Sequence, residues 1–447
     1  MTPPPDRAFV VVGAGLAGSL LGTMLARDGF SVTAIERRAD PRRAGAEAGR
    51  SINLALSARG LHALEQVGLR EAILDLAVPL RGRMVHPVKG ALAFQPYGAR
   101  GRAIYSLSRA ALNAALLDAA EQAGAVLRFG MRCAGVDLAR GEVIAVRAHD
   151  GGGVERLTGT IVGADGAYSA VRGELMRRDR HDFSQEYLAH GYRELHIPAA
   201  PGGTFRLDPH ALHIWPRGGF MMMAMANREG SFTVTLYLPY EGEISFDSLT
   251  GPEPVRRFFT EQFPDAVPLL PGLEEAWFRH PTGSLLTVRT SPWHAGDKAV
   301  LIGDASHAIV PFFGQGANAA FEDCVALRAA LAGSPGGTGR AAAFRGFEAE
   351  RRPHTDAIAE LALANFREMR DQVASPLFRL EKRAEVVLHR LLPRWYLPLY
   401  TMISFTRIPY AEARERARRQ RRLINLIVGL LLAATAAAAV GLLAGKL

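Results

Sequence analysis

The sequence contains little cysteine and no metal-binding pattern. Only Cys133 and Cys324 occur among 447 residues, and no CxxC spacing, HExxH motif or internal repeat is present. Two isolated cysteines give no disulfide framework, and they are typical of a chain in a reducing compartment. The sequence therefore indicates neither a metal site nor a disulfide scaffold, and its length favours two or more domains.

Most of the chain is close to neutral, because much of its positive charge lies in one short block. The net charge is +9, and residues 414–422 (RERARRQRR) hold six arginines and one glutamate, so five of these nine charges lie there. Nucleic-acid-binding proteins spread basic residues over a folded face and interleave aromatic residues. This block contains no aromatic residue. The charge pattern therefore argues against a nucleic-acid partner.

A long uncharged segment follows the basic block. Residues 423–443 carry no formal charge, and a helix of this length reaches about 31 Å, close to the hydrocarbon thickness of a bilayer. We therefore expect a C-terminal transmembrane helix over 423–443. Its basic flank would keep the catalytic body in the cytoplasm. A buried C-terminal helix is the alternative, favoured by the alanine-rich middle and by Asn425.

The first 36 residues follow a strand–helix–strand pattern. We expect strands over 8–12 and 31–36 and a helix over 16–28. A G-x-G-x-x-G motif joins the first strand to the helix.

Each residue of this motif has a physical role in binding a dinucleotide. Gly13 permits the tight turn, Gly15 lets a pyrophosphate approach the backbone, and Gly18 lets the helix pack on the strand. The helix begins at Leu16, so its free N–H groups face the anion. Glu36, at the end of the second strand, is placed to accept hydrogen bonds from ribose hydroxyls. An acid there favours NAD or FAD over NADP.

Two later strand ends also combine glycine with an acid. The segment IVGADGAYSAVR (161–172) contains Asp165, and LIGDASHAIVPFFGQGANAAFED (301–323) contains Asp304. Three such strand ends indicate one extended cofactor along the carboxyl edge of a single sheet.

The middle of the chain changes character. Short apolar segments such as ALHIWP, FMMMAMA and SFTVTLYLP lie between turns rich in glycine and proline. In residues 231–238 apolar side chains alternate with two threonines and Tyr237, which is typical of a strand with one core face and one mixed face. Residues 339–422 are helical in pattern and are interrupted by prolines. We therefore expect an antiparallel sheet followed by a helical region.

These motifs together support a resemblance to known proteins. GAGLAG, GADG and GDASHAIVPFFGQGAN resemble the aromatic hydroxylases among FAD monooxygenases, which have the para-hydroxybenzoate hydroxylase fold. Narrower motifs are similar to those of the kynurenine 3-monooxygenase family: GRSINLALSARG, RGRMVH, QPYG, PFFGQGAN, LANFREM and YTMISFTRIPYAEA. The motifs extend from Gly13 to about Arg414.

The resemblance implies a reaction and its partners. FAD would be bound, NADPH or NADH would visit transiently, and L-kynurenine would be hydroxylated to 3-hydroxykynurenine in tryptophan degradation toward NAD synthesis. Dioxygen would add to the reduced flavin at C4a, and the distal oxygen of this hydroperoxide would attack the ring. No catalytic residue is then expected, because the chain supplies orientation and excludes water.

By the same resemblance, a set of residues is expected to bind FAD. The backbone of the Gly314–Asn318 segment and the positive end of the following helix would lie against the N1–C2=O edge of the flavin. The full set is Gly13, Gly15, Leu16, Gly18, Glu36, Arg37, Ala55, Arg109, Asp165, Asp304, Gly314, Gly316, Ala317 and Asn318.

A second set is expected to bind the substrate. Arg83 suits the carboxylate, because a guanidinium pairs bidentately where lysine does not. The remaining carboxylate contacts implied are Tyr97, Asn365 and Tyr400. Contacts to the ring and the pocket wall are implied for Met369, Tyr237, Pro311, Phe312 and Phe313.

The expected fold is an α/β Rossmann-like FAD-binding domain with an inserted antiparallel β-sheet substrate domain. The FAD-binding domain would comprise residues 1–180 and 296–335, with the substrate domain at 181–295. A helical region at 336–422 and the membrane helix at 423–443 would follow.

Two other functions stay open, as does a homodimer. One is a membrane-attached flavin epoxidase or reductase of a lipid substrate, and the other is a non-catalytic FAD-binding interaction protein. An arginine that binds a carboxylate argues against the first, and substrate-stimulated oxidation of NADPH would argue against the second.

Overall fold

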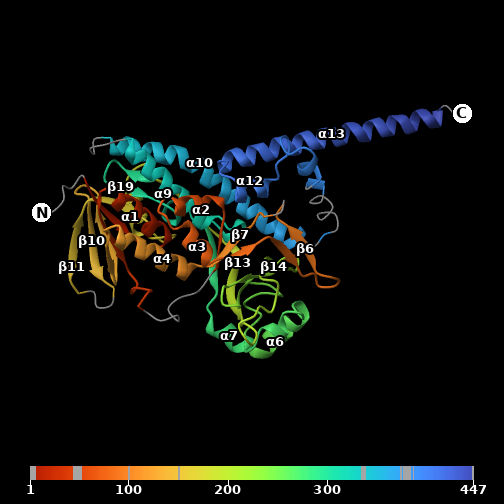
Figure 1. The fold of residues 1–447 in the computed structure, drawn as a ribbon, viewed down its shortest axis with the longest axis horizontal. Helices are drawn as coiled ribbons and strands as arrows, with labels where there is room; N and C mark the ends of the chain where they lie inside the picture. The colour runs from red at the N-terminus through yellow and green to blue at the C-terminus, as the bar shows by residue number, and fades with distance from the viewer. Residues whose placement is uncertain are drawn as a thin grey trace.

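Two large sheets and the helices that cover them form the body of the molecule, and the last helix projects from it (Figure 1). The computed structural model describes residues 7–43, 53–98, 101–148, 152–333, 339–372, 375, 384–385 and 387–444. The motif GRSINLALSARG begins at residue 49, so its first four residues lie outside the described part of the chain.

The first sheet has six strands in the order β18-β19-β12-β1-β2-β8, and each neighbouring pair except β18–β19 is parallel. Strands buried on both faces need continuous apolar runs, and β1 supplies the sequence AFVVV. The predicted strand–helix–strand unit is confirmed. Its elements and the other strands are β1 (Ala8–Val12), α1 (Leu16–Arg27), β2 (Ser31–Glu36), β8 (Val126–Phe129), β12 (Thr160–Gly163), β18 (His294–Ala295) and β19 (Ala299–Leu301).

The second sheet has seven strands in the order β17-β13-β16-β15-β14-β5-β6, and only the β14–β5 pair is parallel. Two of its strands come from the first hundred residues and five from residues 182–291. They are β5 (Gly82–Val85), β6 (Ala93–Pro96), β13 (Asp182–Ile197), β14 (Ala211–Pro216), β15 (Met221–Ala226), β16 (Phe232–Pro239) and β17 (Gly283–Ser291).

The two faces of this second sheet meet different partners, as the alternation in β16 predicts. Phe232 and Val234 pack with α6 (Pro252–Gln262) and α7 (Leu273–Arg279), which lie below the sheet in Figure 1. Tyr237, on the opposite face, packs with Phe312 and Phe366 from later segments. The sheet therefore has one face in a closed core and one face turned toward residues 310–313 and α10 (Arg340–Arg367).

The other elements connect these layers. Two three-stranded sheets have the orders β11-β10-β9 and β3-β7-β4. Their strands are β3 (Asn53–Leu56), β4 (Val78–Leu80), β7 (Ile104–Ser108), β9 (Met131–Asp137), β10 (Glu142–Arg147) and β11 (Val154–Thr158). The helices are α2 (Ala58–Glu65), α3 (Arg70–Asp75), α4 (Arg109–Gln122), α5 (Ala170–Leu175), η2 (Val267–Leu269), α8 (Asp304–His307), η3 (Pro311–Phe313), α9 (Gly316–Ala332), the π-helix η4 (Glu368–Gln372), α12 (Leu399–Phe405) and α13 (Tyr410–Ala444).

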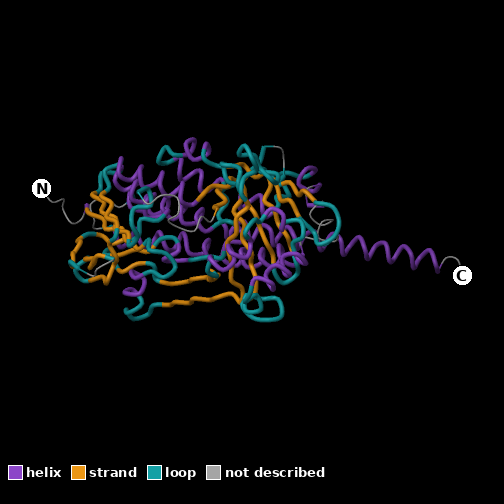
Figure 2. Tube along the Cα trace, turned by 90° about the horizontal axis from the view of Figure 1, so that it is seen from below, coloured by secondary structure: helices purple, strands orange, loops and turns teal. Residues whose placement is uncertain are grey.

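The C-terminal helix α13 begins inside the body and then leaves it. Tyr410 and Ala413 are fully buried among residues of α10 and α12. Further along the helix, the side chains of Leu426 and Leu430 are 59% and 62% exposed. Figure 2, turned by 90° from Figure 1, shows the same helix extending away from the rest of the molecule.

The predicted transmembrane helix over 423–443 is wrong. Among the residues that the structure describes, no helix combines enough length with enough apolar character to cross a membrane. The prediction rested on the absence of formal charge and on a length that matches the bilayer, and neither is sufficient for a span. Here the uncharged segment continues a helix that carries the arginine block, and Asn425 and Thr435 interrupt it. The predicted location, a membrane anchor with the catalytic body in the cytoplasm, loses its basis with this helix.

A buried tryptophan, Trp277, lies in the core beneath the second sheet, and its removal should destabilise the fold. Trp277 is fully buried, its ring lies 5.7 Å from that of Phe246, and the guanidinium of Arg193 lies 4.2 Å above it. Trp277→Ala should lower the free energy of unfolding by about 3–5 kcal/mol, because a large cavity replaces these contacts. The next residue is the matched control: Phe278 is 50% exposed, so Phe278→Ala should change stability by only about 0.5 kcal/mol. Urea denaturation followed by circular dichroism measures both, and equal losses would contradict this packing.

Candidate functional site

The three predicted glycine–acid segments meet at one edge of the first sheet. β19, β12, β1 and β2 are successive parallel neighbours, so their carboxyl ends lie side by side. The G-x-G-x-x-G turn follows β1, Glu36 ends β2, Asp165 follows β12 and Asp304 follows β19. Ligands of open α/β sheets bind at this edge.

The three motif glycines differ in the space around them, and this difference tests the fit of a dinucleotide. A Cβ on Gly13 would lie 2.5 Å from the carbonyl oxygen of Ala164, and the φ of Gly13 is +102°. A Cβ on Gly18 would lie 1.9 Å from the carbonyl oxygen of Gly13. A Cβ on Gly15, in contrast, would meet no described atom within 4 Å apart from its own chain neighbours. Gly13 and Gly18 are thus required for packing, whereas Gly15 borders a cradle at the start of α1, where Leu16 begins the helix.

Glu36 is held in place beside this turn. One carboxylate oxygen accepts the N–H of Ala14 at 3.2 Å, and the other accepts the N–H of Arg38 at 3.0 Å. Arg37, between them in sequence, is exposed. Beyond Glu36, near the ends of β2 and β8, lies an open hollow of about 590 Å³ lined by Ala39, Asp40, Arg43, Glu121, Leu127, Phe129 and Gly130. The carboxyl edge of the first sheet therefore continues past Glu36, and the hollow there has room for a further part of a ligand.

The two other strand-end acids differ in what they contact. The carboxylate of Asp165 accepts the N–H of Ala170 at 2.7 Å and a hydrogen bond from the Ser169 hydroxyl, so it caps α5. Burial raises the pKa of Asp165. Asp304 is exposed at the start of α8, after Gly303 with φ +58°. Asp304 is therefore open to a ligand, while the oxygens of Asp165 are already bonded within the protein.

The Gly-Gln-Gly loop lies against strand β3. The side-chain amide of Asn318 donates to the carbonyl oxygens of Ala55 and Gly314, at 2.9 and 2.8 Å, and its oxygen accepts the N–H of Ser57 at 2.9 Å. Gly314 has φ +65°, and a Cβ there would lie 3.1 Å from the Ala55 methyl group. The side chain of Asn318 thus fixes the loop to β3 and leaves the loop backbone to face a ligand.

The remaining predicted cofactor residues lie nearby on helix ends. Gly316 and Ala317 form the first turn of α9, so their N–H groups are at its positive end. Arg109 is the exposed first residue of α4, directly after β7, which pairs with β3.

Arg83 lies in a buried aromatic setting in β5. Its side chain is only 10% exposed, and its guanidinium lies 5.0 Å above the ring of Tyr400 and 6.0 Å above that of Tyr97. These two rings stack at 4.8 Å. Burial opposes the charge of Arg83, but Tyr97, Tyr400 and Glu368 outweigh it and raise its pKa, so the guanidinium stays charged.

This pocket contains polar atoms that a ligand could satisfy. Arg83 Nε and Tyr97 Oη are buried and have no hydrogen-bond partner among the described residues. Burial chiefly raises the pKa of Tyr97 far above its usual value, so the hydroxyl keeps its proton. Because unpaired buried donors are costly, both atoms suit an anionic group that enters the pocket.

Contacts among aromatic side chains connect this pocket to the Gly-Gln-Gly loop. The ring of Phe313 lies 5.7 Å from that of Tyr400, and Phe312 lies 4.9 Å from Tyr237. Asn365 at the end of α10 donates to the carbonyl oxygen of Phe312 at 2.6 Å, and to Met369 Sδ at 3.2 Å. Pro311 begins the short helix that carries both phenylalanines. The structure therefore brings all nine predicted substrate residues into one contiguous cluster.

Sequence reasoning missed three residues of this cluster. Glu368, the first residue of the π-helix, forms an ion pair with Arg83 at 3.9 Å. Phe366 stacks on Phe312 at 4.1 Å, and Phe405 lies 6.2 Å from Tyr97. All three stand in the motifs LANFREM and YTMISFTRIPYAEA, so a carboxylate beside Met369 was a signal that could have been used.

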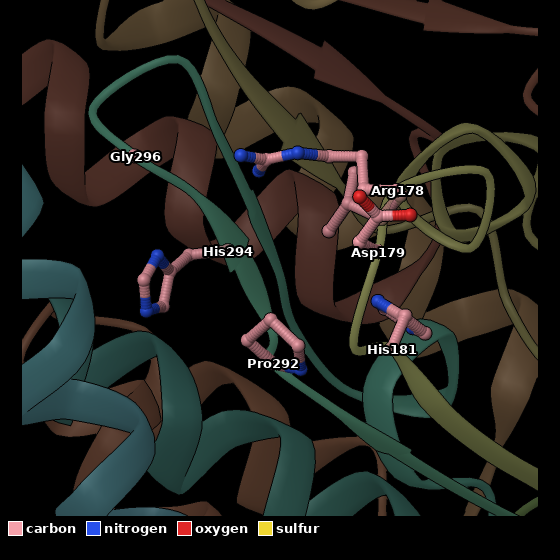
Figure 3. Close-up of a pocket in the computed structure, with 7 residues that line it drawn as sticks. Arg178, Asp179, His181, Pro292, His294 and Gly296 are labelled. Atoms are coloured by element: carbon pink, nitrogen blue, oxygen red, sulfur yellow. The ribbon is translucent and has the colours of Figure 1, made fainter.

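A separate hollow of about 160 Å³ lies elsewhere (Figure 3). Its lining comes from the end of α5, the segment after it and the turn around β18: Leu175, Arg178, Asp179, His181, Pro292, His294 and Gly296. None of the predicted cofactor or substrate residues lines it. It is therefore distinct from the site described above.

Comparison with known proteins agrees with this geometry. The model of the FAD-binding domain family matches residues 7–362. The chain is 50% identical over 408 residues to a kynurenine 3-monooxygenase of Myxococcus xanthus, covering 90% of this chain and 87% of that protein. It is 46% identical over 420 residues to one of Stenotrophomonas maltophilia, covering 94% and 92%.

A solved structure shares the fold. The tetrameric form of 2-methyl-3-hydroxypyridine-5-carboxylic acid oxygenase matches 87% of this chain and 98% of its own, with TM-score 0.67 and 22% identity. Identity this low is informative about the fold alone. The family model and the two relatives cover far more than half of the chain at high identity, and the chain therefore belongs to the FAD-binding domain family and, within it, to the kynurenine 3-monooxygenase family.

Proposed function

We propose that this protein hydroxylates L-kynurenine to 3-hydroxykynurenine with FAD, dioxygen and NADPH or NADH. The observation that supports this most is the buried Arg83 with the stacked Tyr97 and Tyr400, one aromatic contact away from the Gly-Gln-Gly loop. Kynurenine carries a carboxylate at one end and an aminobenzoyl ring at the other. The cluster offers a matching charge and an apolar wall in the same order.

FAD would lie along the carboxyl edge of the first sheet. Its pyrophosphate fits the cradle beside Gly15, and its ribose fits Glu36, whose carboxylate the N–H groups of Ala14 and Arg38 already orient. Asp304 and the backbone from Gly314 onward would meet the rest of the cofactor. When bound and reduced, the cofactor activates dioxygen and supplies the oxygen atom.

The side chains of the pocket would bind and orient the substrate. Arg83 would pair with the carboxylate through two parallel hydrogen bonds, while the Tyr97 hydroxyl would donate a third. Glu368, within 3.9 Å of Arg83, carries the charge that an α-ammonium group needs. Tyr237, Phe312 and Met369 would hold the ring.

Exclusion of water is the other contribution that we assign to the chain. Phe312, Phe313 and Met369 are each at most 9% exposed, so a ring among them would be desolvated. The ring amino group of kynurenine donates electron density into the ring, and no protein nucleophile is then needed. Held orientation and a dry site account for the role of the protein.

We assign domains on the same basis. Residues 1–180 and 296–335 would form the FAD-binding domain, and residues 181–295 the substrate domain, to which β5 contributes Arg83. Residues 336–422 would close the pocket with Asn365, Met369 and Tyr400.

The proposal predicts a yellow protein that consumes oxygen only with its partners. Purified protein incubated with L-kynurenine, NADPH and air should form 3-hydroxykynurenine, identified by mass spectrometry, and NADH should be compared at equal concentration. Kynurenine should stimulate oxidation of NADPH. A protein that binds FAD but shows no such stimulation would instead be a non-catalytic flavin-binding protein.

A substitution at Arg83 tests the carboxylate contact. Arg83→Met should raise KM for kynurenine about tenfold to a hundredfold, since a charge-assisted hydrogen bond contributes about 1.5–3 kcal/mol, and it should leave the FAD spectrum unchanged. Arg81→Met is the matched control, because Arg81 is an exposed arginine two residues away. An unchanged KM in Arg83→Met would point to a substrate without a carboxylate, such as a lipid.

A substitution at Gly15 tests the pyrophosphate cradle. Gly15→Ala should weaken FAD binding about tenfold or more by filling the cradle, without unfolding the apoprotein, because φ is −76° and the added methyl meets no protein atom. Gly22→Ala on the same helix is the control, since its methyl would meet only Val32 at 3.7 Å. Titration of apoprotein with FAD, followed by flavin fluorescence, measures both. Equal affinity of the two variants would exclude this position for the pyrophosphate.

A further inference from the structure

The C-terminal segment reaches the Gly-Gln-Gly loop through one buried hydrogen bond. Tyr410, the first residue of α13, is fully buried, and its hydroxyl donates to the side-chain oxygen of Gln315 at 2.8 Å. Gln315 lies between Gly314 and Gly316 and is only 2% exposed. Its side chain therefore points into the protein, while the adjoining loop backbone borders the proposed cofactor site.

A buried arginine holds Tyr410 in this position. The guanidinium of Arg59, from α2, lies 3.9 Å above the Tyr410 ring. Arg59 also donates to the carbonyl oxygen of Ile403 at 3.0 Å and to that of Ile408. Arg59 thus binds the backbone on both sides of the turn that joins α12 to α13. Its charge is balanced by Glu322 of α9, at 2.6 Å.

The same network continues to the turn after β19. Glu322 also pairs with Arg351, which pairs with Asp323 at 2.9 Å. Asp323 in turn accepts the N–H of Gly303 at 3.0 Å. This network therefore supports the turn after β19, and Tyr410 connects it to the side-chain oxygen of Gln315. Burial raises the pKa of Tyr410 well above its usual value, which favours the protonated hydroxyl that donates to Gln315.

We infer that Tyr410 is a positioning residue for the flavin: through Gln315 it sets the backbone of the Gly314–Gly316 loop against the ring. The inference rests on the proposed placement of the flavin at this loop. Tyr400, which belongs to the substrate pocket, lies ten residues earlier in the same segment. One stretch of chain, from α12 to the start of α13, therefore supports the loop and lines the pocket together.

The reduction potential of bound FAD tests this role. N–H groups and a helix N-terminus held against the ring stabilise the negative charge of the reduced flavin, so a displaced loop should lower the potential. Tyr410→Phe removes only the hydroxyl and keeps the ring beneath Arg59. We expect the equilibrium constant for reduction to fall about tenfold, which is about 30 mV for a two-electron couple. The FAD holoprotein is measured without substrate by spectroelectrochemistry.

Two further variants make the result specific. Gln315→Met removes the acceptor, and the double variant Tyr410→Phe/Gln315→Met should fall no further than either single variant, because both changes remove the same contact. Tyr240→Phe is the control: its hydroxyl donates to Ser284 in the second sheet at 3.2 Å, and its loss should leave the potential unchanged.

Each outcome decides for or against the inference. An unchanged potential in Tyr410→Phe, or additive shifts in the double variant, would overturn it. If Tyr410→Phe fails to retain FAD, the shift in Gln315→Met decides alone, with no shift counting against the inference. Failure of the proposed function is separate, because it would show as absent kynurenine-stimulated oxidation of NADPH in the unchanged protein, whose FAD potential remains measurable.

Discussion

Parallel pairing of β19, β12, β1 and β2 is the constraint on which the rest of the structure depends. Parallel strands end at a common edge, so turns far apart in the chain meet there and can bind one extended ligand. The chain between β12 and β19, residues 164–298, contains five of the seven strands of the second sheet. The second sheet is thus largely an insertion between two neighbouring strands of the first sheet, while the proposed substrate pocket also draws on β5, η3, α10 and α12.

Buried charges beneath this edge are paired. Asp323 is fully buried, and its burial acts to raise its pKa, but His307 and Arg351 outweigh this and lower it. The carboxylate therefore remains charged and accepts the N–H of Gly303. A buried charge without partners would cost several kcal/mol. The paired arrangement instead fixes the turn after β19, and the Arg59–Tyr410 contact extends the same support to the C-terminal segment.

Local sequence predicted the nucleotide edge better than the pocket. The left-handed φ of Gly13 and the contact of Gly18 with the Gly13 carbonyl oxygen both arise within one strand–turn–helix unit, so the motif and its spacing were sufficient. Arg83, in contrast, lies in β5, which pairs with β14 more than a hundred residues later, and its ion pair with Glu368 spans a still longer separation. No local pattern encodes such a pair. The resemblance to a family supplied Arg83, Tyr97 and Tyr400, and the acid opposite them was missed.

The sequence by itself determined the strand–helix–strand unit, the glycine turn and the alternating faces of β16, because backbone conformation and side-chain periodicity depend on near neighbours. Only the tertiary structure decided which acids are open to a ligand. Asp165 and Asp304 follow similar strands with similar glycines, yet the first caps α5 and the second is exposed. The uncharged C-terminal segment shows the same limit, since absence of charge did not make it a membrane span. The partner of a side chain is set by contacts between distant segments, and those exist only once the chain has folded.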